Sequence, residues 1–286
     1  MAVATQSLKR WLGFIKGNAL EVFKGILRVN LCIAATIILG LIILVAVSAV
    51  VWTAGDKISG LIKIGAFILF VVFLALSQAF LAPLYRTIHA IYERKERVNI
   101  LKVAKERARP IIIYQIIVTL LYVLAVILII GPSVILILIN FNVTNTAGPF
   151  IIAVVVFGIL LQFAFYELGV SNKGPIESIK ASISLVIHNI RNSLALTVAR
   201  GAVSSAVGIA FTVLFYIVMK FILQNTTIEV TDISSLEPFF VFLGMIIFGV
   251  YVLFYVTLIE TVELPMTYVF WRALSDNKTF DLCKRV

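Results

Sequence analysis

The sequence predicts an all-α fold, a polytopic membrane protein with six transmembrane helices arranged in three hairpins. Three observations support this prediction. The 286 residues are 62% hydrophobic and only 13% charged, whereas soluble domains carry about 25% charged residues. The mean hydropathy of +1.10 leaves too few polar side chains to cover a surface in water. Apolar runs also recur at the length that a spanning helix requires, about 20 residues.

Six apolar segments are long enough to cross a bilayer as helices, and together they define one membrane domain, residues 29–272. These segments cover residues 29–52, 61–84, 111–139, 149–166, 201–223 and 239–259. Residues 1–28, before the first span, are predicted to form a cytoplasmic amphipathic helix, and residues 273–286 a cytoplasmic tail. The polar segments between spans are only as long as loops, so we expect no separate soluble domain.

The distribution of basic residues predicts the orientation in the membrane. All 24 Lys and Arg residues except Lys57, Lys63 and Lys220 fall in the N-terminal segment, the second and fourth loops or the C-terminal tail. Lys and Arg accumulate in the cytoplasmic loops of membrane proteins. We therefore expect a multi-pass protein of the cell membrane with both termini in the cytoplasm. The regular alternation of basic and non-basic segments favours an even number of spans.

Three cytoplasmic segments have the spacing of amphipathic helices. In residues 8–27, an apolar stripe that includes Trp11 and Phe23 is interleaved with Lys and Arg. This combination favours a helix that lies in the membrane interface. The fourth loop shows the same pattern after Pro175, which stands near the first position that helices favour for proline, and the second loop shows it more weakly. The chain thus divides into three units of surface helix, outward span and inward span, although any three hairpins with this charge bias would look alike.

The net charge of +10 also bears on partners. In a soluble protein such a charge would favour nucleic acid, but here membrane topology and anionic lipid head groups explain it. We expect the lipid bilayer and anionic head groups as partners, other membrane proteins as further candidates, and no nucleic acid. The candidate contacts with anionic lipid, all in the second loop, are Arg94, Lys95, Arg97, Lys102 and Lys105.

A few polar residues could lie within the bilayer, where an ionisable side chain is costly and indicates function. Glu260 and Glu263 lie three residues apart and share one helix face. Inside the bundle this pair could bind a cation or relay a proton. If the last span ends at Ile259, both carboxylates instead lie at the cytoplasmic interface. The candidate polar site comprises Glu260, Glu263, Glu167, Gln162 and Gln78.

Glu167 also has a structural interpretation, because it could cap the following turn or pair with Lys173. His89 and His188 have no neighbours at metal-ligand spacing, and we expect both to be solvated. The chain has no Walker loop, Rossmann glycine pattern, zinc-protease motif or nucleophile elbow. We therefore predict no catalytic residue, no metal and no cofactor, and we expect the protein not to be an enzyme.

The most specific stretch is the fourth cytoplasmic segment, residues 167–189. An acidic residue at a span end is followed by a glycine-proline start, a short charged and apolar helix, and an asparagine. The residues that carry this pattern are Glu167, Gly174, Pro175, Glu177, Lys180, Ser182, Val186 and Asn189. The segment resembles the membrane domain of the glycerophosphodiester phosphodiesterase superfamily, which includes YciC-type inner-membrane proteins. The span ends at Pro83 and Pro265 fit the same family, whereas Ser178 stands where the family favours alanine.

This resemblance implies a six-span membrane protein and supplies no catalytic residues. The superfamily takes its name from members that are fused to a catalytic barrel, and we expect no such soluble domain here. Phosphodiesterase activity therefore does not follow from the resemblance.

Three hypotheses for function remain open. The first is a non-enzymatic scaffold or accessory membrane subunit, which fits the lack of catalytic motifs. The second is a small transporter or lipid-handling carrier that uses intramembrane carboxylates. The third is an intramembrane enzyme acting on lipid. The carrier and the enzyme both require the candidate polar residues to face one interior volume, whereas a scaffold does not.

Overall fold

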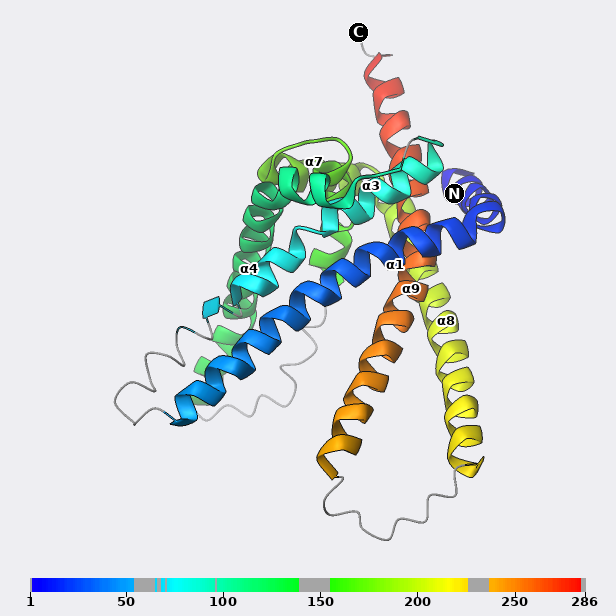
Figure 1. Cartoon of the computed structure of the whole chain (residues 1–286). Helices are drawn as coiled ribbons and strands as arrows, with labels where there is room; N and C mark the ends of the chain where they lie inside the picture. The colour runs from blue at the N-terminus through cyan, green and yellow to red at the C-terminus, as the bar shows by residue number, and fades with distance from the viewer. Residues whose placement is uncertain are drawn as a thin grey trace.

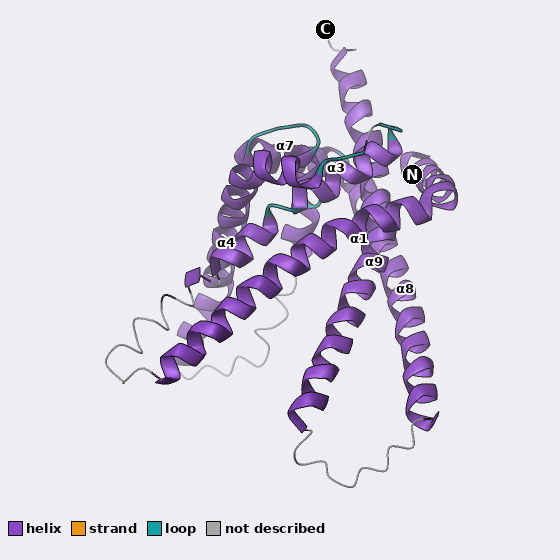
Figure 2. Cartoon of the chain, in the orientation of Figure 1, coloured by secondary structure: helices purple, strands orange, loops and turns teal. Residues whose placement is uncertain are grey.

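The computed structural model describes residues 2–53, 65, 68–69, 71–95, 97–138, 155–225 and 237–283. Within these ranges every regular element is a helix and no strand occurs (Figure 2). The predicted all-α fold class is therefore confirmed. The labelled helices are α1 (Ala2–Thr53), α3 (Leu81–Tyr92), α4 (Ile100–Leu138), α6 (Ala164–Gly169), α7 (Pro175–His188), α8 (Ile190–Asn225) and α9 (Glu237–Cys283). Residues 71–78 and 155–161 are helical as well.

Four helical segments in the described ranges are long and apolar enough to cross a membrane, which fits a membrane protein. They are Val3–Ile43, Val71–Tyr92, Ile190–Ile217 and Ile247–Asp276. A shorter apolar stretch covers Val155–Gly169. The predicted spans 61–84, 111–139 and 149–166 and the predicted tail 273–286 lie partly outside the described residues.

The predicted surface helix 1–28 and the first span, 29–52, form one continuous helix, α1, of 52 residues. The end of the last predicted span at residue 259 is likewise not a break, because α9 continues through Pro265 to Cys283. Glu260 and Glu263 thus lie within a long helix and not at its end. In the fourth loop, α7 begins at Pro175, as the sequence predicts, and the Glu177 side chain accepts a hydrogen bond from the Gly174 backbone N–H at 3.3 Å.

The packed core lies at one end of the bundle. In α1, Val22, Ile26 and Val29 are fully buried, whereas Ile42 and Val45, further along the same helix, are exposed. Figure 1 shows α8 and α9 side by side near α3 and diverging toward the opposite end. Exposed apolar side chains on the diverging parts suit a bilayer, because lipid tails are as apolar as these side chains.

Aromatic residues fill much of this core. The rings of Tyr166 and Trp271 stack with centroids 5.7 Å apart, and Tyr85 meets Tyr166 edge-on at 4.6 Å. Tyr268 packs against Tyr166 from the same helix as Trp271. Such ring pairs contribute about 0.5–1.5 kcal/mol beyond the area they bury. They join α3, α6 and α9 at the packed end of the bundle.

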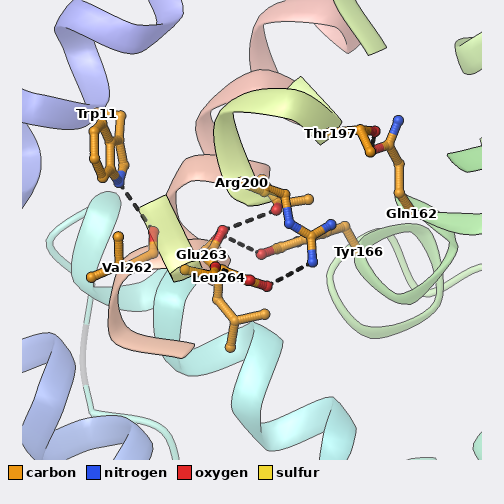
Figure 3. A network of polar contacts seen from close by, with 10 residues as sticks. Trp11, Gln162, Tyr166, Thr197, Arg200, Val262, Glu263 and Leu264 are labelled. Atoms are coloured by element: carbon orange, nitrogen blue, oxygen red, sulfur yellow. Dashed lines mark hydrogen bonds and ion pairs between the residues drawn. The ribbon is translucent and has the colours of Figure 1, made fainter. Parts of the chain in front are cut away.

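The long helix α9 contains Pro265, which has no N–H to donate and disturbs the preceding turn. Donors from other helices reach two backbone carbonyls in the turn that precedes this proline (Figure 3). Trp11 Nε1 of α1 donates to the Val262 carbonyl oxygen at 3.2 Å. The Tyr166 hydroxyl of α6 donates to the Leu264 carbonyl oxygen at 2.5 Å. Neighbouring helices supply bonds of this kind where proline loosens a membrane helix, so Pro265 helps to dock α1 and α6 on α9.

Substitution of two glycines of α1 by alanine should change the free energy of unfolding in opposite directions. A Cβ at Gly40 would lie 2.7 Å from Phe73 Cβ, which is fixed to its own backbone, whereas a Cβ at Gly13 meets nothing within 4 Å. We expect Gly40→Ala to lower the free energy of unfolding by about 1–3 kcal/mol through overpacking. Gly13→Ala should raise it by about 0.5–1 kcal/mol through helix propensity.

Unfolding by SDS in mixed micelles, with loss of helical circular dichroism as the measure, compares these two variants with the parent chain. Equal stability changes in both variants would contradict the close packing of α1 on the helix of residues 71–78.

Candidate functional site

Glu260 lies on the side of α9 that packs against α1. Asn30 Nδ2 donates to Glu260 Oε2 at 2.7 Å and to the Thr257 hydroxyl oxygen at 3.1 Å. Asn30 and Thr257 are both buried. The Glu260 carboxylate therefore has a hydrogen-bond partner on the first helix of the chain.

Glu263 lies one turn further along α9 and faces α8 (Figure 3). Arg200 Nη2 lies 2.8 Å from Glu263 Oε2 in an ion pair, and the Ser204 hydroxyl donates to Glu263 Oε1. Glu260 and Glu263 thus share a helix but contact different neighbours, α1 and α8. Arg200 and Ser204 each donate to one carboxylate oxygen of Glu263, so both oxygens are hydrogen-bonded.

Glu167 is buried at the end of α6, with a side chain only 7% exposed. Lys173 Nζ lies 2.6 Å from Glu167 Oε2, so the predicted pairing with Lys173 is confirmed. The other oxygen, Oε1, accepts a hydrogen bond from Trp271 Nε1 at 2.9 Å. The carboxylate therefore joins the loop after α6 to α9, which is a structural role.

The two candidate glutamines each pair with a polar residue on another helix. Gln115 Nε2 of α4 donates to Gln78 Oε1 at 3.1 Å. The Thr197 hydroxyl of α8 donates to Gln162 Oε1 at 3.4 Å. Interhelical pairs of this kind contribute about 0.6 kcal/mol on average in membrane proteins.

These two pairs and the Asn30–Glu260 pair occupy matching places in the three units of the chain. In the three units predicted from the sequence, each pair joins the later helical segment of one unit to the first long helix of the next unit. Gln78 and Gln162 reach α4 and α8 in this way, and Glu260 of the last unit returns to α1 of the first. The polar pairs therefore form a ring that closes the bundle.

The first-helix partners in this ring are Asn30, Gln115 and Thr197, and sequence reasoning missed all three. Each directly follows a residue that is at most 2% exposed, namely Val29, Tyr114 and Leu196 respectively. The sequence does contain a sign of these partners. It is a polar residue directly after a large apolar residue, close to the start of each outward span. Arg200 was likewise assigned only to membrane topology, although it forms the ion pair with Glu263.

The candidate polar residues do not converge on one cavity. Of the five, only Gln162 is on the described lining of the cavity of about 260 Å³ between α3, α4, α6, α8 and α9. No group of three metal-ligating side chains occurs within the described ranges. In the described part of the chain, Glu260 and Glu263 hydrogen-bond to different helices, α1 and α8, and neither residue lines this cavity.

A larger groove, of about 710 Å³, lies between the N-terminal half of α1 and the segment that follows α3. Its basic side chains come from both walls, two from α1 and three from the segment after α3. They are Lys24, Arg28, Arg94, Lys95 and Arg97. Glu21 is the one acidic side chain on the described lining. Lys102 and Lys105, the other two predicted lipid contacts, are exposed on α4 outside this groove.

The two histidines behave differently. His188 is exposed, as expected, and its Nδ1 lies 2.7 Å from the Ser184 carbonyl oxygen. For His89 the expectation of a solvated ring is wrong. Its Nδ1 lies 2.7 Å from the Tyr268 hydroxyl, and its Nε2 lies 3.2 Å from Lys95 Nζ. The packing of α3 against α9 brings this ring into contact, which spacing along the sequence could not reveal.

Comparisons with protein-family models, with curated proteins and with solved structures give no match to this chain. The functional argument therefore rests on the contacts of its own residues.

We expect the Arg200–Glu263 pair to stabilise the fold. A double-mutant cycle measures the coupling energy between the two side chains. Arg200→Met alone or Glu263→Met alone leaves a charged group without its partner and should lower the free energy of unfolding by about 1.5–3 kcal/mol. The double variant should recover most of that loss, because two apolar side chains then pack together.

The exposed pair Arg272–Asp276, with an N–O distance of 3.7 Å, provides the matched control. Asp276→Asn should change stability by no more than about 0.5 kcal/mol. Additive losses in the double variant would argue against a structural pair and in favour of a site that needs Glu263 charged.

Proposed function

We propose that this chain is a multi-pass protein of the cell membrane that acts as a non-enzymatic scaffold or accessory subunit and holds anionic lipid at its cytoplasmic face. The basic groove between α1 and the segment after α3 is the observation that carries this proposal. The partner proposed for it is a lipid head group that bears phosphate.

The proposed membrane arrangement has six spans in three hairpins, with both termini and the amphipathic helices on the cytoplasmic side. Four long apolar helices and the apolar stretch Val155–Gly169 support it, as does the unbroken course of α4 to Leu138. The alternation of basic segments along the chain supplies the orientation. We also propose membership of the glycerophosphodiester phosphodiesterase membrane-domain superfamily, which implies the same arrangement.

The contacts of the acidic residues favour a scaffold over the alternative, a carrier that uses intramembrane carboxylates. Glu167, Glu260 and Glu263 each bind separate donors on different helices. A carrier requires polar groups that face one shared volume and can release their partners. Fixed pairs between helices instead stabilise one arrangement of the bundle.

The groove has the chemistry of a phosphate site. Lys24 and Arg28 lie four residues apart and so share one face of α1. Arg94, whose φ of 52° is unusual for a non-glycine residue, belongs to the turn that forms the opposite wall. Cations on two walls can bind a phosphate from both sides, and each Lys or Arg near an anionic surface contributes about 1 kcal/mol.

The proposed topology predicts the location of reporters fused along the chain. A reporter that is active only in the cytoplasm should work at residue 1 and at residue 286, and fail when inserted after Lys57 or Glu229. Termini on opposite sides of the membrane would require an odd number of spans and would contradict the three-hairpin arrangement.

The groove predicts a position-dependent loss of anionic lipid binding. Lys24→Gln combined with Arg97→Gln should weaken binding of phosphatidylglycerol by about 30-fold at low salt, since two charges correspond to about 2 kcal/mol. Native mass spectrometry of the purified full chain in mixed micelles measures the bound lipid.

The matched control is Lys102→Gln combined with Lys105→Gln, which removes the same charge outside the groove. This control should change binding by no more than about twofold, and raised salt should weaken binding by the parent chain. Equal losses in the two double variants would show that only net charge matters and would overturn the groove as the site.

A further inference from the structure

His89 lies close to the basic groove, although it is not on the described lining of the groove. It belongs to α3, which begins after a turn at residues 79–80, beyond the predicted span 61–84. Figure 1 shows α3 at the packed end of the bundle. The Nε2 atom of His89 lies 3.2 Å from the Nζ atom of Lys95, which is one of the five basic residues on the groove lining. The ring therefore contacts a side chain that the proposed lipid site uses.

Hydrogen bonds on the other side of the ring determine which nitrogen carries the proton. The Tyr268 hydroxyl donates its hydrogen to Glu93 Oε1 at 3.2 Å. The Tyr268 oxygen, 2.7 Å from His89 Nδ1, therefore accepts a hydrogen bond from that nitrogen. In the neutral ring Nε2 then carries no hydrogen and accepts from the Lys95 ammonium group. The neutral ring thus draws the Lys95 side chain toward α3.

Protonation of His89 changes this contact from attraction to repulsion. The added hydrogen is on Nε2, so Lys95 loses its acceptor and faces a positively charged ring at 3.2 Å. Lys95 is exposed, and its long side chain can rotate away from the ring toward the groove. Tyr268 keeps its hydrogen bond, because Nδ1 carries a hydrogen in both forms of the ring. The contact is therefore reversible without any change in the packing of α3 on α9.

The charged groups around the ring determine the pH at which it is protonated. In the described part of the chain they come from α3, from the turn after it and from α9, and they are Arg86, Glu93, Lys95 and Arg272. Across the groove, α1 adds Glu21, Lys24 and Arg28 opposite Lys95. Burial of the ring and the Lys95 ammonium group lower the pKa of His89 from its ordinary value of 6.5, and Glu93 opposes this shift. The ring is therefore neutral at neutral pH and becomes charged as the pH falls below about 6.5.

We propose that His89 regulates the anionic-lipid groove, because the neutral ring holds Lys95 away from a bound phosphate and the protonated ring releases Lys95 to it. This inference rests on the groove proposed above and adds a dependence on pH. Protonation of His89 strengthens lipid binding by the same factor by which bound lipid favours protonation. Two unit charges at this separation in water correspond to a change of up to about tenfold.

The test measures equilibrium binding of fluorescently labelled phosphatidylglycerol to the purified full chain in mixed micelles, at about pH 7.5 and at about pH 5.5. The lipid phosphate stays charged at both values, and the ordinary pKa of glutamate, about 4.3, lies below this range. The parent chain should bind about fivefold more tightly at the lower pH, because protonation is nearly but not fully complete there.

Two histidine variants assign the pH dependence to one ring. His89→Gln should bind equally at the two pH values to within about twofold, since glutamine does not titrate and its amide can bond to both Tyr268 and Lys95. His188→Gln is the matched control, because His188 is exposed on α7 and does not line the groove. This control should keep the fivefold difference of the parent chain.

The pKa of His89 gives a second measurement that requires no lipid. The chain has two histidines, so NMR titration of the His188→Gln variant reports on His89 alone. Lys95→Gln should raise the pKa of His89 by up to about one unit, because it removes the neighbouring ammonium group. Lys105→Gln removes the same charge from α4 outside the groove and should leave that pKa unchanged. Lys95 is exposed, so this variant keeps the test valid if His89→Gln fails to fold.

Equal affinity of the parent chain at both pH values, or tighter binding at the higher one, would overturn the proposed regulation. A pH dependence that His89→Gln retains would overturn it too, as would a pKa of His89 that Lys95→Gln leaves unchanged. The groove survives these results if Lys24→Gln with Arg97→Gln still weakens binding at neutral pH. If that double variant has no effect, or if no lipid binds at either pH, the groove is overturned and its regulation with it.

Discussion

The contact between Asn30 and Glu260 joins α1 to α9. It satisfies a constraint that applies to the whole bundle, namely that polar groups within a membrane need hydrogen-bond partners in the protein. Lipid offers no hydrogen-bond partner, so each polar group at the membrane level must find one on another helix. Asn30, with a donor distance of 2.7 Å to Glu260, satisfies this need between the first and last long helices. The Gln78–Gln115 and Gln162–Thr197 pairs do the same between the other units. The three pairs join segments that also pack through apolar side chains, and two of their members, Gln115 and Gln162, line the cavity.

The groove and the cavity differ in the charge of the residues that line them. Among the described lining residues of the groove, five are basic and one is acidic. In the cavity, Glu263 pairs with Arg200, the one charged residue on its described lining. Salt should therefore weaken the proposed binding of anionic lipid in the groove, because it screens the attraction between exposed charges. Both recesses lie at the packed end of the bundle, where side chains from several helices meet.

Composition and hydrophobic periodicity were sufficient to predict the helical fold. Each helix makes its backbone hydrogen bonds within one segment, and the length of its apolar run can be read directly from the sequence. The start of α7 at Pro175 and the pairing of Glu167 with Lys173 followed from local chemistry over a few residues. Contacts between distant helices were beyond such reasoning. Glu260 and Glu263 share a helix face by spacing, yet packing gives them different partners on α1 and α8. Spacing along the sequence also suggested a solvated His89, whereas the packing of α3 on α9 brings this ring into contact with Tyr268.

The sequence could not predict the groove either, because the groove also depends on contacts between distant segments. Arg94, Lys95 and Arg97 were predicted as lipid contacts because they form a basic run, but Lys102 and Lys105 belong to that run as well. Only the position of α1 separates the two sets, by bringing Lys24 and Arg28 across from the first three.

The closure of the ring through α1 and α9 has a consequence for how the protein is made. Asn30 and Glu260 are separated by 230 positions in the chain, so the first helix enters the membrane long before its partner has been synthesised. Until then the Asn30 amide lacks its acceptor, and Trp11 lacks the carbonyl of Val262. Insertion of the first helix alone is thus a provisional state that an insertion chaperone or a lipid head group can stabilise. Translation of the last helix supplies both partners, together with the α9 side chains that complete the core.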